Sequence, residues 1–234
     1  MKPADVVLQA NNLIEEIYQV AKGRGGTVRM GFGPAPSHTF LSEVISLCRK
    51  SSPQLTLETA IGSTQQLAEL MQNGKIDLAI CPLDKDLFKT PLDTQLLLEE
   101  HVVIAARPEH PIFLKPLTDP GSFFGHQVVL PVLEPRYRLL TKQLYNIDVA
   151  KLSNLVLCSD YTVLIKLILS GDFITAGPRF TFREEIEKGN LKVIVMDERV
   201  KHRIHLIANR SALNFPALEN VILNIQQVVK NQPN

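Results

Sequence analysis

Small polar residues follow an apolar run at two places in the chain, one in each half. In the first copy the apolar segment 55–61 is followed by 62–66, where Ser63 and Gln66 have the S-x-x-Q spacing of a capping box. In the second copy, Ser159 and Asp160 follow the apolar segment 155–158. Helix N-termini at the carboxyl ends of strands bind small anions. The two copies therefore predict a binding pocket with two halves and not a reaction centre.

The residue types that carry catalysis or bind metals show no organised spacing. Glu99 and Glu100 are neighbours in an expected strand, and such neighbours point to opposite faces. There is no nucleophile elbow, phosphate loop or dinucleotide fingerprint. The three cysteines form no CxxC pair, which is typical of a reducing compartment: Cys48, Cys81 and Cys158. The six histidines have no spacing typical of a metal site: His38, His101, His110, His126, His202 and His205. We expect no enzyme activity, no cofactor and no metal.

Composition and charge exclude other classes of protein. Apolar residues make up 45% of the 234 residues and charged residues 21%, which is typical of a globular chain. The formal net charge of +1 does not favour nucleic-acid binding by bulk electrostatics. No run approaches the roughly 20 apolar residues of a membrane span, and the N-terminus lacks the apolar core of a signal peptide. We expect a soluble cytoplasmic protein that does not bind a membrane.

The apolar periodicity predicts alternating strands and helices. In the first half, strands are expected at 27–31, 55–61, 76–81 and 101–106, and helices from Ser37 or Thr39 to about 50 and over 63–73. Gly74 suits the left-handed position that ends a helix. This order implies parallel strands, and hence an α/β fold. The second half repeats the pattern, with strands at 127–130, 155–158, 173–176, 191–195 and 204–207 and helices at 136–146, 161–170, 181–188 and 216–230.

The first residues predict an amphipathic helix over 3–22. Its apolar residues follow the a/d alternation of a coiled coil: Val6, Ala10, Leu13, Ile17 and Val20. Only about two heptads are present, so two interpretations stay open. The helix packs on its own domain, or it pairs with a second copy of the chain.

Several blocks of the sequence resemble the effector-binding region of LysR-type transcriptional regulators. They span about residues 26–180 and comprise 26–31, 65–70 followed by 74–79, 107–112, 160–169 with Gly171, and 177–178. The resemblance implies two Rossmann-like lobes joined by two crossing hinge strands, as in type II periplasmic binding proteins, preceded by a linker helix. It places the linker or dimerisation helix in 1–25, lobe I in 26–103 and 202–234, and lobe II in 104–201.

The family's site lies between the lobes, and the resemblance assigns residues of this chain to it. Lobe I would contribute Ser63 and Thr64. The segment 33–36, with two prolines, replaces the usual hydroxyl residue of the first turn, which moves that contact to Ser37. Cys81 ends a strand near the same place, as a contact or as a buried thiol. Lobe II would contribute residues from three strand ends: Leu133, Glu134, Tyr161 and Arg179.

Each of these residues has a purely structural alternative. Ser63 acts only as a helix cap, or it caps while the next amides bind the effector. Tyr161 stacks on the effector or lies at the rim. Arg179 pairs with an anion or stays solvated.

The resemblance implies a ligand-sensing domain of a transcription regulator. A small, organic or inorganic, anionic effector would change the lobe angle and thereby the spacing of attached DNA-binding domains. Self-association as a homodimer or homotetramer would use both lobes and the linker helix. DNA would be bound only through a winged helix-turn-helix, which this sequence does not contain. A solute-binding protein for transport is the alternative function.

Overall fold

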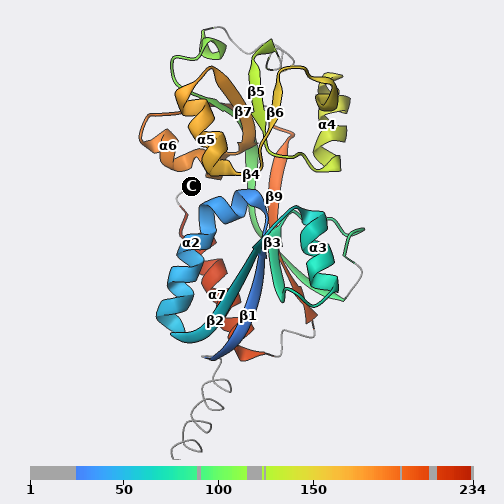
Figure 1. Ribbon diagram of the computed structural model, residues 1–234, viewed down its shortest axis with the longest axis vertical. Helices are drawn as coiled ribbons and strands as arrows, with labels where there is room; N and C mark the ends of the chain where they lie inside the picture. The colour runs from blue at the N-terminus through green and yellow to red at the C-terminus, as the bar shows by residue number, and fades with distance from the viewer. Residues whose placement is uncertain are drawn as a thin grey trace, which may run out of the picture. The chain divides into compact units, whose positions relative to one another are not determined.

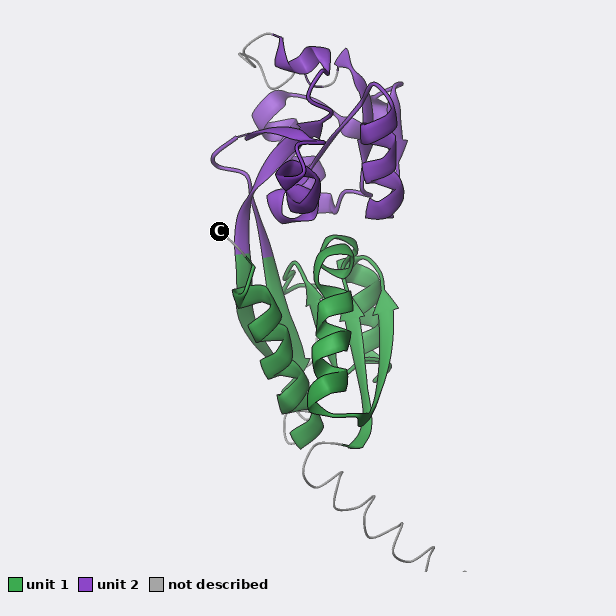
Figure 2. Cartoon of the chain, turned by 90° about the vertical axis from the view of Figure 1, so that its left-hand side faces the viewer, with its two compact units in different colours: residues 1–98, 204–234 green, residues 99–203 purple. Residues whose placement is uncertain are grey.

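The computed structural model describes residues 25–232 except 89–90, 115–122, 124, 196 and 211–214. The helix expected over 3–22 lies outside these residues. The chain forms two compact units, unit 1 with Met1–Leu98 and Ile204–Asn234 and unit 2 with Glu99–Arg203 (Figure 2). The chain leaves unit 1 within strand β4 (Leu92–Ala106) and returns to it within strand β9 (Lys201–Asn209).

Unit 1 contains a mixed sheet in the strand order β2-β1-β3-β9, with β4 next to β9. Strand β1 is parallel to both β2 and β3, while β3 and β9 are antiparallel. The parallel strands confirm the β-α-β-α-β order that the sequence predicts. Their bounds are Gly25–Phe32 for β1, Gln54–Ile61 for β2 and Leu78–Cys81 for β3.

Helices cover both faces of this sheet (Figure 1). Helices α2 (Pro34–Ser51) and α7 (Pro216–Lys230) lie on one side, and α3 (Thr64–Gln72) lies on the other. The stripe of Phe40, Val44 and Cys48 on α2 is fully buried, as the i, i+4, i+8 spacing requires.

The start of α2 differs from the sequence prediction. The helix begins at Pro34 with Gly33 as its N-cap, not at Ser37 or Thr39. Pro34 takes the first helical position, where a missing amide hydrogen costs nothing and the fixed φ suits the helix. Ser37 is consequently a first-turn residue, and its hydroxyl donates to the Pro34 carbonyl at 2.8 Å.

Helix α3 is terminated by the glycine that the sequence predicts. Gly74 has φ +63°, and Lys75 N donates to Leu70 O at 2.8 Å. A six-to-one bond of this kind, across a left-handed residue, is the Schellman motif.

Unit 2 contains a second mixed sheet, in which β4 lies between β8 (Lys192–Val195) and β7 (Phe173–Pro178). Strand β5 (Gln127–Leu130) pairs in parallel with β7 on one side and with β6 (Leu155–Leu157) on the other. Strand β6 is therefore at the edge of this sheet.

Helix α4 (Pro135–Tyr145) and helix α5 (Tyr161–Ser170) follow β5 and β6. The predicted helix at 181–188 is wrong in part, because a 3-10 helix, η4 (Arg179–Phe182), precedes a short α6 (Arg183–Glu187). Two further 3-10 turns, η1 (Pro111–Phe113) and η3 (Val149–Lys151), complete the elements that the structure describes in unit 2.

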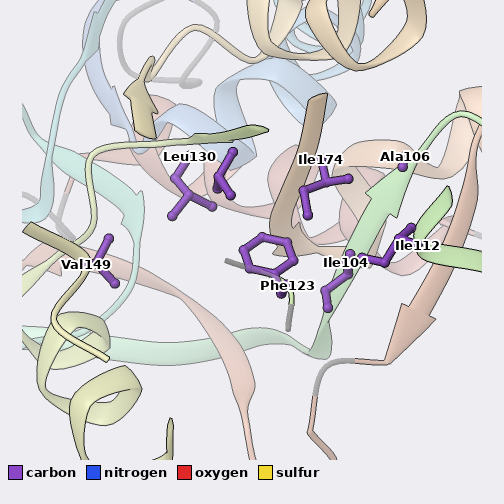
Figure 3. Close-up of a cluster of buried hydrophobic side chains, with 8 residues drawn as sticks. Ile104, Ala106, Ile112, Phe123, Leu130, Val149 and Ile174 are labelled. Atoms are coloured by element: carbon purple, nitrogen blue, oxygen red, sulfur yellow. The ribbon is translucent and has the colours of Figure 1, made fainter. Parts of the chain in front are cut away.

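The core of unit 2 is built from strands and loops of distant sequence. Figure 3 shows the fully buried Phe123 ring among residues of β4, β5 and β7. The cluster comprises Ile104, Ala106, Ile112, Phe123, Val128, Leu130, Val149 and Ile174. Leu133 packs against this cluster, so the loop after β5 is anchored to the core.

Among the described residues, no helix combines the length and the apolar character needed to cross a membrane.

Candidate functional site

The carboxyl ends of the three parallel strands of unit 1 meet at one edge of the sheet. Hydrogen bonds tie the loops that follow them: Gly33 N donates to Ile80 O at 2.8 Å, and Gly62 N donates to Phe32 O at 3.1 Å. Helices α2 and α3 start from these loops, so their N-termini are held at the same edge.

Ser63 is the N-cap of α3, as its spacing from Gln66 predicts. Its hydroxyl accepts from Gln66 N at 3.3 Å, and the Gln66 side chain accepts from Ser63 N at 2.9 Å. The Gln65 amide lies between them in the first turn, where the helix itself supplies no acceptor. The helix dipole adds about half a positive charge at this end, and the serine cap leaves it uncompensated.

Two of the other residues expected in unit 1, Thr64 and Cys81, are buried. Thr64 is buried, and its hydroxyl donates to Pro82 O at 3.5 Å. Cys81 is fully buried in a core cluster with α3. Ser37 is half-buried.

Unit 2 has a corresponding edge at the ends of β5, β6 and β7. Cys158 N donates to Leu130 O at 2.8 Å, and Val132 N donates to the Ser159 hydroxyl at 3.2 Å. Asp160 caps α5 by accepting from Thr162 N at 2.8 Å and Val163 N at 3.3 Å. The two copies of the pattern thus share their geometry.

The N-termini of α3 and α5 differ in charge, however. Helix α3 carries a neutral cap, whereas the Asp160 carboxylate already balances the positive end of α5. An incoming anion is therefore favoured at α3 and opposed at α5.

The residues expected in unit 2 occupy different environments. Arg179 is exposed at the end of β7. The Glu134 carboxylate lies 3.8 Å from the Arg136 guanidinium at the start of α4. Leu133 is half-buried, and its carbonyl accepts from Arg138 Nε at 3.0 Å.

Tyr161 lies in the interior and not at a rim. It is 4% exposed, its ring centroid lies 6.4 Å from that of Phe182, and burial raises the pKa of its hydroxyl. Gly177 has no side chain where these rings pack: a Cβ there would lie 3.2 Å from Phe182.

A polar cluster in unit 2 was not predicted from the sequence. Arg136 donates to the Tyr137 hydroxyl at 2.5 Å, and this hydroxyl lies 2.5 Å from His202 Nδ1. The Tyr137 and His202 rings are stacked with centroids 5.6 Å apart, and the Phe180 ring is 6.3 Å from His202. Tyr137 and His202 are 65 residues apart, so no local spacing signals the pair.

Burial sets the protonation of this cluster. Desolvation, reinforced by the nearby Arg136 charge, lowers the pKa of His202 to about 3, so the imidazole is neutral at pH 7. Desolvation also raises the pKa of Tyr137, which keeps the phenol protonated. The cluster is thus a neutral donor–acceptor pair next to one guanidinium.

Two α/β units, each with helix N-termini gathered at the carboxyl edge of its sheet, define the class of the periplasmic-binding-protein-like regulatory domains. Residues 21–230 match the family model described as the LysR substrate binding domain, so the chain belongs to this family.

Solved structures of the class share the fold. A full-length OxyR variant from Pseudomonas aeruginosa superposes with a TM-score of 0.70 at 17% identity, covering 97% of this chain and 77% of that one. The regulatory domain of MetR from N. meningitidis superposes with a TM-score of 0.69 at 19% identity, covering 87% and 93%.

The curated relatives are transcriptional regulators. The regulator CatR of Pseudomonas putida is 29% identical over 130 residues, which is 56% of this chain and 44% of CatR. The regulator GalR of Pseudomonas putida is 23% identical over 208 residues, 88% of this chain and 52% of GalR. The chain thus spans about half the length of these two relatives.

Proposed function

We propose that this chain is the effector-sensing domain of a LysR-type transcriptional regulator and that its effector is a small anion. Binding of the effector would control DNA binding by a helix-turn-helix domain of the regulator, and the chain itself would do no covalent chemistry. Membership of the family and the regulator names of the curated relatives support this function.

The neutral cap of α3 is the observation that supports an anionic effector. Ser63 and Gln66 satisfy two first-turn amides, and the Gln65 amide between them points from a positive helix end. Unit 2 would contribute Arg179, whose exposed guanidinium suits a carboxylate or an oxyanion. Ser37, Thr64, Cys81, Leu133, Glu134 and Tyr161 would then shape the surroundings of these contacts.

The mechanism would be a shift of population. An effector that contacts one conformation better than another favours it by its differential binding free energy, typically about 1–3 kcal/mol. That conformation would alter how the domains of the regulator assemble.

A thermal-shift screen of small carboxylates, inorganic oxyanions, amino acids and neutral analogues tests the effector class. A ligand at 100 times its dissociation constant adds about 2.7 kcal/mol to the free energy of unfolding. We expect stabilisation by at least one anion and none by its neutral analogue. Stabilisation by neutral compounds alone would overturn the anionic class.

Ser63→Asp tests the α3 terminus itself. Aspartate caps helices as well as serine does, as Asp160 does on α5, so the variant should keep its stability. Its carboxylate would repel the effector, and we expect the anion found in the screen to bind about tenfold more weakly or worse. Isothermal titration calorimetry measures this loss.

Two control variants separate charge from stability. Ser153→Asp adds the same charge at an exposed turn of unit 2 and should bind as the natural chain does. Ser63→Ala removes the cap and should lower the free energy of unfolding by about 1 kcal/mol. Equal binding by Ser63→Asp and the natural chain would exclude the α3 terminus as the anion site.

We also propose that the chain self-associates through the exposed edges of its two sheets, in a side-by-side, antiparallel arrangement. Strand β2 ends the strand order of unit 1 and β6 ends that of unit 2, and both carry exposed apolar residues. Unpaired strand edges with apolar side chains favour association.

A further inference from the structure

Two ring nitrogens in unit 2, His101 Nδ1 and His202 Nε2, are buried without a hydrogen-bond partner among the described residues. His202 is half-buried as a residue, but its Nε2 atom has no solvent contact and no hydrogen-bond partner among the residues that the structure describes. Buried polar groups are nearly always hydrogen-bonded. The Nε2 atom therefore calls for a partner that the described part of the chain does not supply.

The hydrogen-bond chain through Tyr137 assigns a proton to this atom. Arg136 can only donate, so the Tyr137 oxygen accepts from it. The single phenolic proton then goes to His202 Nδ1, the remaining neighbour at 2.5 Å. A neutral imidazole with Nδ1 as acceptor carries its hydrogen on Nε2. The unsatisfied group is thus a donor.

The opposite tautomer would leave more groups unpaired. With a hydrogen on Nδ1, both the Tyr137 proton and the bare Nε2 atom would lack partners. The low pKa of His202 also excludes the imidazolium form at pH 7.

A second histidine of unit 2 shows what a satisfied ring is like. His110 Nδ1 accepts from Ile112 N at 3.1 Å, which places its hydrogen on Nε2, and Nε2 lies 3.3 Å from the Asp172 carbonyl. The chain thus completes both ring nitrogens of His110 but only one of His202.

The unpaired donor lies close to the carboxyl edge of the unit 2 sheet. Tyr137 is in the first turn of α4, directly after the loop that follows β5, and Phe180 directly follows β7. Arg136 contributes a positive charge to the same cluster, with its guanidinium 4.5 Å from the centre of the Tyr137 ring and 3.8 Å from the Glu134 carboxylate. A partner for Nε2–H must accept a hydrogen bond, and the guanidinium favours one that is negative.

We propose that His202 is an effector-recognition residue, whose Nε2–H donates a hydrogen bond to a carboxylate oxygen of a small organic acid. This inference rests on the proposed function and adds to it the chemical class of the anion and a second residue of unit 2, besides Arg179, that would bind it. Arg136 and Tyr137 act as positioning residues, because they fix the tautomer that makes Nε2 a donor.

Nitrogen NMR of the natural chain tests the tautomer. In the ¹⁵N-histidine-labelled protein, the His202 signals should show a protonated Nε2 and a bare Nδ1 at pH 7. Addition of acetate, succinate, pyruvate or benzoate should shift the Nε2–H resonance for at least one acid. A hydrogen on Nδ1, or an Nε2–H resonance that no acid moves, would overturn the proposal.

Substitution tests the hydrogen bond. His202→Gln keeps a donor near the Nε2 position, whereas His202→Phe keeps a ring and removes the donor. For the acid that binds most tightly, we expect His202→Phe to weaken binding about tenfold or more and His202→Gln only a few-fold. His126→Phe makes the same change at another half-buried histidine of unit 2 and should leave binding unchanged. Circular dichroism and the melting temperature check that each variant is folded.

The outcomes distinguish this proposal from the proposed function. If an acid binds and His202→Phe retains full affinity, the role of His202 is wrong while the sensing function stands. If only inorganic oxyanions stabilise the chain, the role of His202 is likewise wrong while the sensing function stands. If no compound of the whole screen stabilises it, both are wrong.

Discussion

His110 and His202 are neutral at pH 7 for the same physical reason. Burial removes each ring from water, which opposes its charged form and lowers the pKa of both residues. Unfolding would return each to the ordinary histidine pKa of about 6.5. Both histidines therefore link folding to pH.

Because the folded-state pKa of these histidines is lowered, the free energy of unfolding should decrease in mild acid. Below about pH 6.5 the unfolded chain binds protons at these histidines and the native chain does not, so acid favours unfolding. For His202 this difference in bound protons between the unfolded and the native chain persists down to about pH 3. We expect the free energy of unfolding, measured with urea, to fall between about pH 7 and about pH 5.

Two acidic groups with strongly lowered pKa values do not contribute to this interval. The pKa values of Glu99 and Asp197 are lowered to about 2, by Lys201 and by Arg199 respectively, so their linkage begins only near the ordinary carboxyl pKa of about 4. His202→Gln and His110→Gln should each flatten the decline. Equal stability at both pH values in the natural chain would contradict the burial of these rings.

Residues that act locally could be predicted from the sequence, and residues that act through the fold could not. The capping box of Ser63 and Gln66 spans four consecutive positions, so spacing and residue type identify it. The Tyr137–His202 pair joins α4 to β9. Neither residue carries a signal of the other, because only the packed unit brings them together.

The same distinction holds for whole elements. Helices α5 and α7 begin and end where the sequence predicts, since each combines an apolar stripe with a clear first-turn signal. Strand β4 begins at Leu92, well before the predicted start at His101. Its first residues are largely exposed and show no alternation, and it is pairing with β9 that makes them a strand.

Helix termination gives a prediction for a single glycine. Gly74 has φ +63°, and a Cβ there would meet nothing within 4 Å. Gly74→Ala therefore costs only the strain of a left-handed alanine, about 1–2 kcal/mol in the free energy of unfolding. Chemical denaturation measures this loss.

Gly125→Ala is the matched control. A Cβ at Gly125 also meets nothing within 4 Å, but its φ is outside the left-handed region. The free energy of unfolding should stay unchanged or rise by a few tenths of a kcal/mol, since alanine restricts the unfolded chain. If both variants lose the same free energy, the left-handed conformation is not the cause.

Each unit has a sheet edge with apolar side chains in water. Ile61 at the end of β2 is 62% exposed, and Val156 and Leu157 in β6 are 41% and 50% exposed. Neighbouring residues of a strand point to opposite faces, so both faces of β6 are partly uncovered. A monomer that left such edges bare would be prone to irregular association.

Pairing of copies through these edges predicts a concentration-dependent oligomer. Sedimentation velocity on the full chain, with residues 3–22 included, should show a dimer or a larger symmetric species. Leu157→Lys places a charge on the β6 edge and should raise the dissociation constant about tenfold or more. Leu114→Lys puts the same charge on a residue that is 80% exposed and belongs to neither edge, so association should not change. A chain that stays monomeric at high concentration would contradict the pairing, whereas loss of association in Leu114→Lys as well would exclude β6 as its particular site.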